Sequence, residues 1–126
     1  MNKLIKKAHA ARKKAYVPYS NFRVGAALET KEGRIFTGCN IENASFGITI
    51  CAERVALFKA IAEGAKKFKR IAIVADTREP CSPCGICRQA LFEFAPDLEV
   101  VMANVKGKSR ALRLTSLLPN GFKLKK

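Results

Sequence analysis

Three cysteines and one glutamate stand at spacings that suit a catalytic metal ion. Cys51 and Glu53 are two residues apart, and Cys84 and Cys87 follow Pro83 in a Pro-Cys-x-x-Cys pattern. Three thiolates can hold zinc in a tetrahedral site whose fourth position stays open, which is typical of catalytic zinc. A carboxylate beside that open position can take a proton from water and return it to a substrate. The pattern therefore predicts a zinc enzyme with Glu53 as its proton carrier.

Other uses of these cysteines are open at this point. The spacing of Cys81, Cys84 and Cys87 resembles three ligands of an iron–sulfur cluster, although the fourth Cys-Pro of such a run is missing. A closed structural zinc site could use Cys39 or Cys81 as its fourth ligand, but it would give no reason for Glu53. Our default interpretation of Cys39 and Cys81 is that they are small core or loop residues.

Both cysteine segments are expected at the starts of helices. The apolar spacing predicts helices over residues 2–15, 51–62 and 84–94. In the second we expect a buried row of Val55, Phe58 and Ala62, which Leu57 and Ile61 widen. Gly64 should end that helix. Residues rich in β-formers predict strands over 22–29, 34–39, 70–75 and 98–105, with a further strand or helical turn within 111–118.

The order of these elements predicts the fold. Residues 31–33 form a hairpin turn between the first two strands, and later strands alternate with helices. This arrangement favours a single domain over residues 1–126, folded as a three-layer α/β/α sandwich around a mixed, roughly five-stranded sheet.

Electrostatics favours thiolates at helix starts, because the positive ends of the helix dipoles lower the pKa values of nearby thiols. Three thiolates around a divalent zinc ion nevertheless carry a net charge of about −1. Arg54 and Arg88, which are adjacent to the predicted ligands in sequence, are candidates to offset that excess.

Composition excludes some classes of function. The net charge of +14, from 24 basic and 10 acidic residues, could indicate a nucleic-acid partner. However, the basic residues are spread along the chain without interleaved aromatic residues, so we expect a solvated surface and no nucleic-acid partner. No apolar run approaches the ~20 residues of a membrane span. An odd number of cysteines and no secretory signal favour a reducing, cytoplasmic location.

Four motifs, in order, resemble the small zinc-dependent cytidine deaminases that act on free nucleosides. The likeness covers nearly the whole chain. The motifs are Pro-Tyr-Ser-Asn-Phe-Arg-Val-Gly-Ala-Ala at 18–27, Gly-Cys-Asn-Ile-Glu-Asn-Ala at 38–44, Cys-Ala-Glu-Arg at 51–54 and Ser-Pro-Cys-Gly-Ile-Cys-Arg-Gln at 82–89.

The resemblance implies roles for residues at the metal. Zinc would be bound by Cys51, Cys84 and Cys87. Arg54 and Gln89 would bond to ligand sulfurs. A hydroxide on the zinc would attack C4 of cytosine while Glu53 protonates N3, and ammonia would leave to give uridine or 2′-deoxyuridine.

It also implies how substrate is held. Phe22 would pack against the pyrimidine, and backbone groups near Ala52 and Ser82 would read the base. Asn40 and Glu42, within the run Asn40-Ile41-Glu42, would hydrogen-bond the ribose hydroxyls.

The short members of this family are homotetramers in which neighbours complete each pocket, and the resemblance places Phe46 and Phe122 at such contacts. Three rivals differ in class: a deaminase of a nucleoside-like antibiotic such as blasticidin S, a nucleic-acid editor, and a non-catalytic structural zinc module. Asn40, Ile41 and Glu42 favour a plain ribose over the antibiotic.

Overall fold

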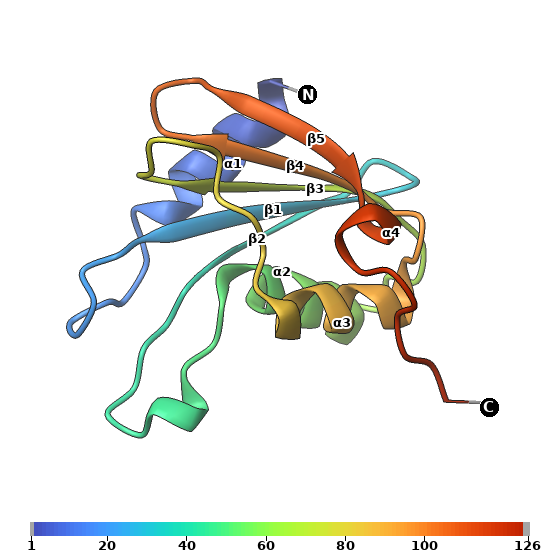
Figure 1. Ribbon diagram of the computed structural model, residues 1–126, viewed down its shortest axis with the longest axis horizontal. Helices are drawn as coiled ribbons and strands as arrows, with labels where there is room; N and C mark the ends of the chain where they lie inside the picture. The colour runs from blue at the N-terminus through green and yellow to red at the C-terminus, as the bar shows by residue number, and fades with distance from the viewer. Residues whose placement is uncertain (1, 125–126) are drawn as a thin grey trace.

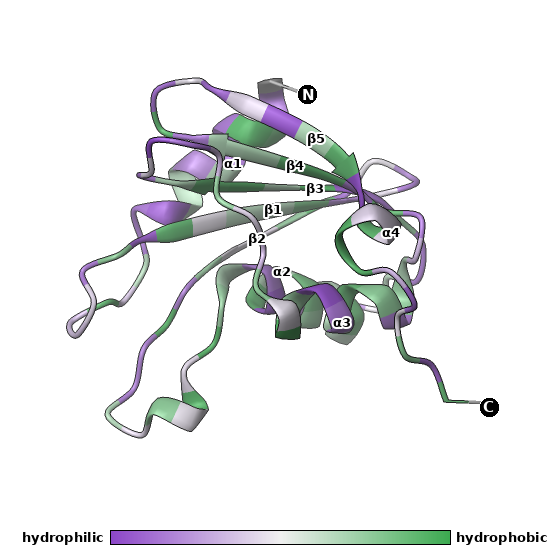
Figure 2. Ribbon diagram, viewed as in Figure 1, coloured by the Kyte–Doolittle hydropathy of each residue, from purple (hydrophilic) through white to green (hydrophobic). Residues whose placement is uncertain are grey.

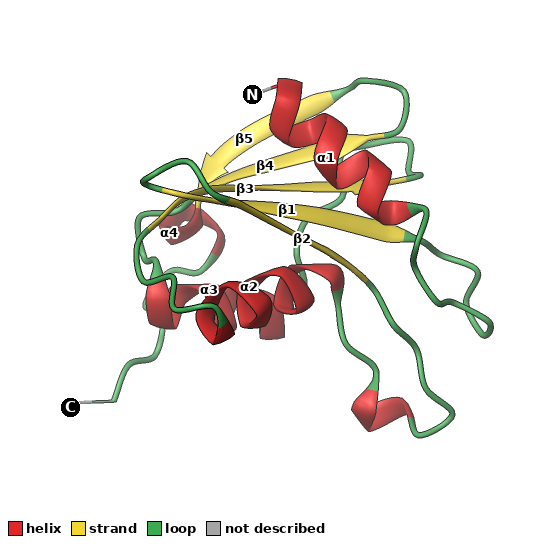
Figure 3. Cartoon of the chain, turned by 180° about the vertical axis from the view of Figure 1, so that it is seen from behind, coloured by secondary structure: helices red, strands yellow, loops and turns green. Residues whose placement is uncertain are grey.

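The computed structural model, which describes residues 2–124, contains one mixed sheet with helices on both faces (Figure 1). The strands lie in the order β2-β1-β3-β4-β5, with bounds Ile35–Cys39, Val24–Thr30, Phe68–Ala75, Glu99–Asn104 and Ser109–Arg113. The helices are α1 (Asn2–Arg12), α2 (Ala52–Ala62), α3 (Gly85–Phe94) and α4 (Leu114–Leu117), and η1 (Phe46–Ile48) is a 3-10 turn. Helix α1 covers one face of the sheet, and α2 and α3 cover the other (Figure 3). The predicted three-layer sandwich is confirmed.

Strand directions bring distant loops to one end of the sheet. β1 and β2 form the predicted hairpin, whose turn includes Gly33 at φ +96°, a conformation that costs glycine little. β1 is antiparallel to β3 with Val24 opposite Ala75, and Gly25 lies opposite Cys39. The start of β1, the end of β2 and the end of β3 therefore meet at the same end of the sheet.

The central strand β3 is buried on both faces, as its apolar run predicts. Ile71 and Ile73 belong to the core beneath α2 and α3, whereas Ala72 and Val74 belong to the core beneath α1. This alternation follows from the two-residue period of a strand. Figure 2 shows β3 and β4 mainly in hydrophobic colours, while the edge strand β5 carries a hydrophilic stretch.

The buried face of α2 agrees with the expected one at Leu57 and differs from it elsewhere. The buried residues are Ala52, Glu53, Ala56, Leu57 and Ala60. Phe58 of the predicted row is 46% exposed. The reason is close packing: a Cβ atom on Gly38 of β2 would lie 2.5 Å from the Ala52 carbonyl oxygen and 2.6 Å from the Ala56 nitrogen. Only the small alanine face allows α2 to approach the sheet so closely, so the large Phe58 points outward.

Helix ends agree with the sequence more closely than helix faces do. Gly64 follows α2 at φ +91°, with hydrogen bonds from Ala65 N to Ala60 O (2.9 Å) and from Gly64 N to Ile61 O (3.0 Å). These two bonds form a Schellman motif, which confirms the predicted stop at Gly64. Residues 111–118 were expected to form a strand or a helical turn, and they contribute to both β5 and α4.

Within residues 2–124, no helix combines the length and the apolar character needed to cross a membrane.

The close approach at Gly38 leads to a stability prediction. Replacing Gly38 with Ala should lower the free energy of unfolding by about 2 kcal/mol, because overpacking a close contact typically costs ~1–3 kcal/mol. Gly47→Ala is the matched control, since no atom lies within 4 Å of its added Cβ. Urea denaturation followed by circular dichroism measures both. Equal midpoints for the two variants would contradict the packing described.

Candidate functional site

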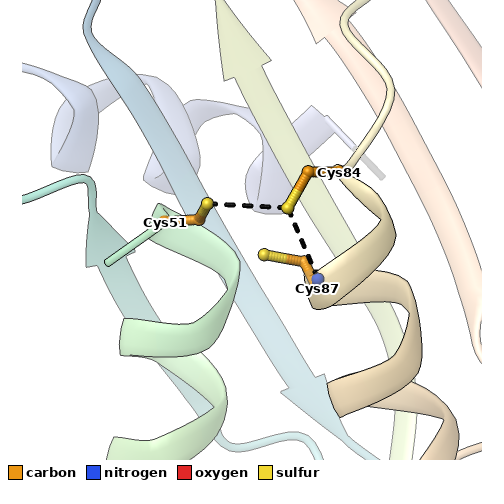
Figure 4. Close-up of side chains that lie close together, drawn as sticks. All are labelled: Cys51, Cys84 and Cys87. Carbon is orange, nitrogen blue, oxygen red and sulfur yellow. Dashed lines mark hydrogen bonds between the residues drawn. The ribbon is translucent and has the colours of Figure 1, made fainter. Parts of the chain in front are cut away.

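The three predicted metal ligands meet in space although they are distant in sequence. The sulfur atoms of Cys51, Cys84 and Cys87 all lie within 4.8 Å of one another. Cys51 comes directly before α2 and Cys84 directly before α3, so two helix starts face each other across the cluster (Figure 4). Their extended backbones, with ψ of 154° and 165°, are those of N-cap residues.

The spacing of the sulfurs fits zinc. Tetrahedral coordination with Zn–S distances of about 2.3 Å places two sulfurs ~3.8 Å apart, and Cys51 Sγ lies 3.7 Å from Cys84 Sγ. The Cys87 backbone N–H donates to Cys84 Sγ at 3.4 Å, so a helix N–H group supports one thiolate. Among the residues that the structure describes, this metal-type cluster contains neither Cys39 nor Cys81. That grouping favours an open three-cysteine site over a closed four-cysteine one.

The protein groups around the sulfur cluster affect the ionisation of Cys51 and Cys87 in opposite directions. A hydrogen bond from Cys87, followed by contacts with Arg54, lowers the pKa of Cys51 to about 5. The same bond, together with burial, raises the pKa of Cys87. The protein groups thus favour the thiolate of Cys51 over that of Cys87. A divalent metal ion would supply positive charge that favours the thiolate form of its ligands.

Arg54 contacts the sulfur cluster as predicted. Its Nη2 donates to Cys51 Sγ at 3.6 Å. Its Nε is buried and has no hydrogen-bond partner within residues 2–124. A buried guanidinium is costly unless negative charge lies nearby, so Arg54 is consistent with a site built to hold several thiolates.

Glu53 has the properties of an acid–base group. It is 4% exposed, and burial raises its pKa to about 7, with a smaller contribution from the Cys51 charge. A carboxyl group that titrates near neutral pH can both donate and accept a proton there. Glu53 also lines a cavity beside the sulfurs.

That cavity has a volume of about 190 Å³ and lies where the loops meet at the end of the sheet. Five predicted residues line it together with Cys51 and Cys84, namely Phe22, Asn40, Ala52, Glu53 and Ser82. Val24, Ile73 and Cys81 complete its wall. Of these, Cys81 was interpreted as a plain core or loop residue. Its spacing three residues before Cys84 was the available clue.

Asn40 holds the loop that carries Phe22. Its Oδ1 accepts from Val24 N at 2.9 Å, and its Nδ2 donates to Phe22 O at 2.8 Å. Because both ends of the amide are bonded to backbone, Asn40 fixes the position of Phe22 at the mouth of the cavity.

Glu42 and Ile41 lie outside the lining of this cavity. The Glu42 carboxylate accepts hydrogen bonds from Tyr19 N (3.0 Å), Ser20 N (3.1 Å) and Ser20 Oγ. The Ser20 hydroxyl bond lowers the pKa of Glu42. Glu42 instead lines a neighbouring hollow with Tyr19, Ser20, Phe46 and Thr49. Ile41 exchanges backbone hydrogen bonds with Ile50, and its side chain is 42% exposed.

Arg88 and Gln89 have partners that the sequence did not indicate. The Gln89 side chain, expected to bond a sulfur, exchanges hydrogen bonds with the backbone of Phe122 at 2.8 and 3.2 Å. Arg88, expected to offset thiolate charge, donates to Ser82, Pro83 and Leu117. The expectation for Arg88 relies on nearness in sequence and that for Gln89 on the family resemblance, whereas both side chains bond to the C-terminal segment, residues 114–122.

The two predicted aromatic contacts are exposed. Phe46 is 76% and Phe122 is 65% exposed. The Phe46 ring packs edge-on against Tyr19, with centroids 6.1 Å apart.

Comparison with known proteins gives matches along nearly the whole chain. Residues 1–103 match the family described as the cytidine and deoxycytidylate deaminase zinc-binding region. A cytidine deaminase of Halalkalibacterium halodurans is 52% identical over 120 residues, covering 94% of this chain and 91% of that protein. One of Sporosarcina psychrophila is 49% identical over 123 residues, covering 97% and 90%. The crystal structure of cytidine deaminase from Burkholderia pseudomallei is 52% identical with a TM-score of 0.94, covering 96% of this chain and 98% of that one.

The cluster predicts the metal content of the purified protein. We expect one zinc ion per chain by elemental analysis, and loss of the ion in Cys51→Ala and Cys87→Ala. Cys39→Ala is the matched control because Cys39 is outside the cluster, and it should keep the zinc. A protein that contains iron, or a Cys39 variant that loses zinc as readily as the Cys51 variant, would refute the three-cysteine site.

Proposed function

Because the chain belongs to the cytidine and deoxycytidylate deaminase family, we propose that it hydrolyses free cytidine and 2′-deoxycytidine to uridine and 2′-deoxyuridine, with release of ammonia. The observation that carries this proposal is the position of Glu53. It is a buried carboxyl group whose pKa is raised to about 7, and it lies beside three clustered thiols on the wall of one cavity.

The metal ligands in this proposal are Cys51, Cys84 and Cys87. When bound, zinc supplies the Lewis acidity that makes a water molecule nucleophilic at neutral pH. The reaction forms a C4–O bond and breaks the C4–N bond. Glu53 moves the protons: it accepts one from the water and passes it to N3 of the base, and it then accepts the second from the new hydroxyl group on C4 and delivers it to the departing amino group. Its raised pKa suits both directions of transfer.

The residues around the cavity hold the substrate in this scheme. Phe22, fixed by Asn40, packs against the pyrimidine, and the backbone at Ala52 contacts the base. Asn40 and Glu42 hydrogen-bond the ribose hydroxyls. For Glu42 this requires exchange of its bonds to Ser20, and a depressed pKa keeps it an acceptor for hydroxyl groups. Ile41 lies between Asn40 and Glu42 in the chain, and its antiparallel bridge to Ile50 holds this stretch of backbone in place.

Replacing Glu53 with Gln tests the chemistry. The amide keeps the size of the side chain but cannot carry a proton, so kcat for cytidine should fall by at least 10³-fold, a loss within the range seen for general acid–base groups. Zinc content should be unchanged. The decrease in ultraviolet absorbance on deamination, together with an ammonia assay, measures the rate. Full activity in a zinc-loaded Glu53→Gln protein would sink the mechanism.

We also propose that the chain works as a homotetramer in which Phe46 and Phe122 lie near neighbouring pockets. Two observations support this. Both rings are largely exposed, and the cavity of about 190 Å³ is smaller than the ~300–1,000 Å³ of typical small-molecule pockets, as expected for a site that a neighbour completes.

Phe122→Ala tests the assembly, because loss of a ring that closes a neighbour's pocket should raise KM about 10-fold while zinc stays bound. Leu124→Ala, two residues away and also largely exposed, is the control and should leave KM unchanged. Sedimentation equilibrium that returned a fully active monomer would contradict the tetramer.

We further propose that the protein acts in the cytoplasm, in pyrimidine salvage. The five cysteines are all free thiols, which suits a reducing compartment. Restored growth on cytidine of cells that need an external pyrimidine is the expected result, and failure of the active enzyme to restore it would count against this role.

A further inference from the structure

Arg88 joins the loop over residues 76–83, which leads into Cys84, to the C-terminal segment, residues 114–122. Its Nε donates to Pro83 O at 2.8 Å and its Nη2 to Ser82 Oγ at 2.6 Å, while its Nη1 donates to Leu117 O at 2.7 Å. The first two partners come directly before Cys84, and the third ends α4. One planar guanidinium therefore spans two segments, with a geometry that the point charge of a lysine cannot reproduce.

Gln89, the next residue, holds the following part of the same segment. Its side-chain amide bonds to both the N–H and the C=O of Phe122. Gly121 fits against the face of Phe92, where an added Cβ would lie 2.7 Å from ring carbons. Lys123 Nζ lies 5.5 Å from the centre of the same ring. The C-terminal segment is thus held against α3.

The loop on the other side of Arg88 has little support of its own. Within the described residues, the loop over residues 76–83 makes no backbone–backbone hydrogen bond other than those that belong to the sheet. Asn104 and Lys108 hold the far part of the loop, through Arg78 O and the Glu79 carboxylate. Next to Cys84, the bonds from Arg88 to Ser82 and Pro83 secure it. Ser82 also lines the substrate cavity, whereas Arg88 is not among the residues that line it. The bonds from Arg88 therefore reach the cavity wall from outside.

We propose that Arg88 and Gln89 are positioning residues that form a brace, through which the C-terminal segment holds the Ser82 wall of the substrate cavity in place. The inference rests on the proposed deaminase function, since that function gives the cavity its substrate. It assigns Arg88 a geometric role in place of a charge-balancing one, and it assigns Gln89 to the segment in place of a ligand sulfur.

Arg88→Lys separates geometry from charge, because lysine keeps the charge and loses the fork of donors. KM for cytidine should rise about 10-fold, the loss expected for one or two hydrogen bonds from a charged group, with kcat within about threefold. Gln89→Ala should raise KM by a smaller factor, about threefold, with zinc content unchanged. Arg113→Lys is the matched control, since Arg113 also donates to a backbone carbonyl, that of Asp97, but away from the cavity. It should behave as the wild type.

Measurement of zinc retention tests the alternative, in which Arg88 acts through its charge and Gln89 through a ligand sulfur. If Arg88 acts through charge, Arg88→Lys will keep the wild-type KM while Arg88→Met loses zinc to a chelator faster. If Gln89 bonds a sulfur, Gln89→Ala will lose zinc faster at an unchanged KM. Either result overturns the brace.

Hydrogen exchange of the zinc-loaded protein separates failure of this inference from failure of the deaminase assignment. Faster exchange in both 82–87 and 114–122 of the Arg88→Lys or Gln89→Ala variant supports the brace even if no cytidine is turned over. Faster exchange confined to 114–122 overturns it. Should Arg88→Lys fail to fold, Gln89→Ala carries the same test.

Discussion

The structure depends on bringing three sulfur atoms together without letting their charges repel one another. Two helices make this possible, because α2 and α3 both begin at the cluster, where the positive ends of their dipoles favour thiolates, and the Cys87 N–H of α3 donates to Cys84 Sγ. The small residues of α2, together with Gly38 of β2, determine how close α2 lies to the sheet. Arg54 adds a positive group on one side. The hydrogen bond between Cys51 and Cys87 lowers the pKa of the first and raises the pKa of the second, and a bound cation would favour the ionised form of both.

Around this fixed centre, the residues proposed to hold the substrate lie on loops, except for Ala52 at the start of α2. Phe22 precedes β1, Asn40 follows β2, and Ser82 lies between β3 and α3. Each loop is secured by a side chain that bonds backbone: Asn40 for Phe22, and Arg88 for Ser82. The reacting groups are thus attached to rigid helix starts, whereas the surfaces that select the substrate are adjusted through polar contacts.

Much of this arrangement could be predicted from the sequence, for reasons that differ between residues. Cys51, Glu53, Cys84 and Cys87 were identifiable because metal chemistry demands those residue types at short local spacings. The strands and the stop at Gly64 follow from local propensity. The buried face of α2 could not be read, because apolar residues lie all around that helix and only contact with Gly38 decides which side faces the sheet. The bonds from Arg88 to Leu117 and from Gln89 to Phe122 were equally hidden, since these partners are distant in sequence and depend on where the C-terminal segment packs.

The separation of the ligands along the chain has a consequence for folding. Cys51 and Cys84 are 33 positions apart, and the intervening chain contains α2 and β3. An ion shared by these sulfurs is a cross-link that closes this length of chain into a ring. Bringing together the ends of a loop of that size costs about 3 kcal/mol of conformational entropy, which folding bears before the ion binds. Because the unfolded chain offers no such site, the binding free energy of the ion adds to the free energy of folding. Unlike a disulfide, the link can be removed without any change in oxidation state, so supply of the metal sets how stable the folded chain is.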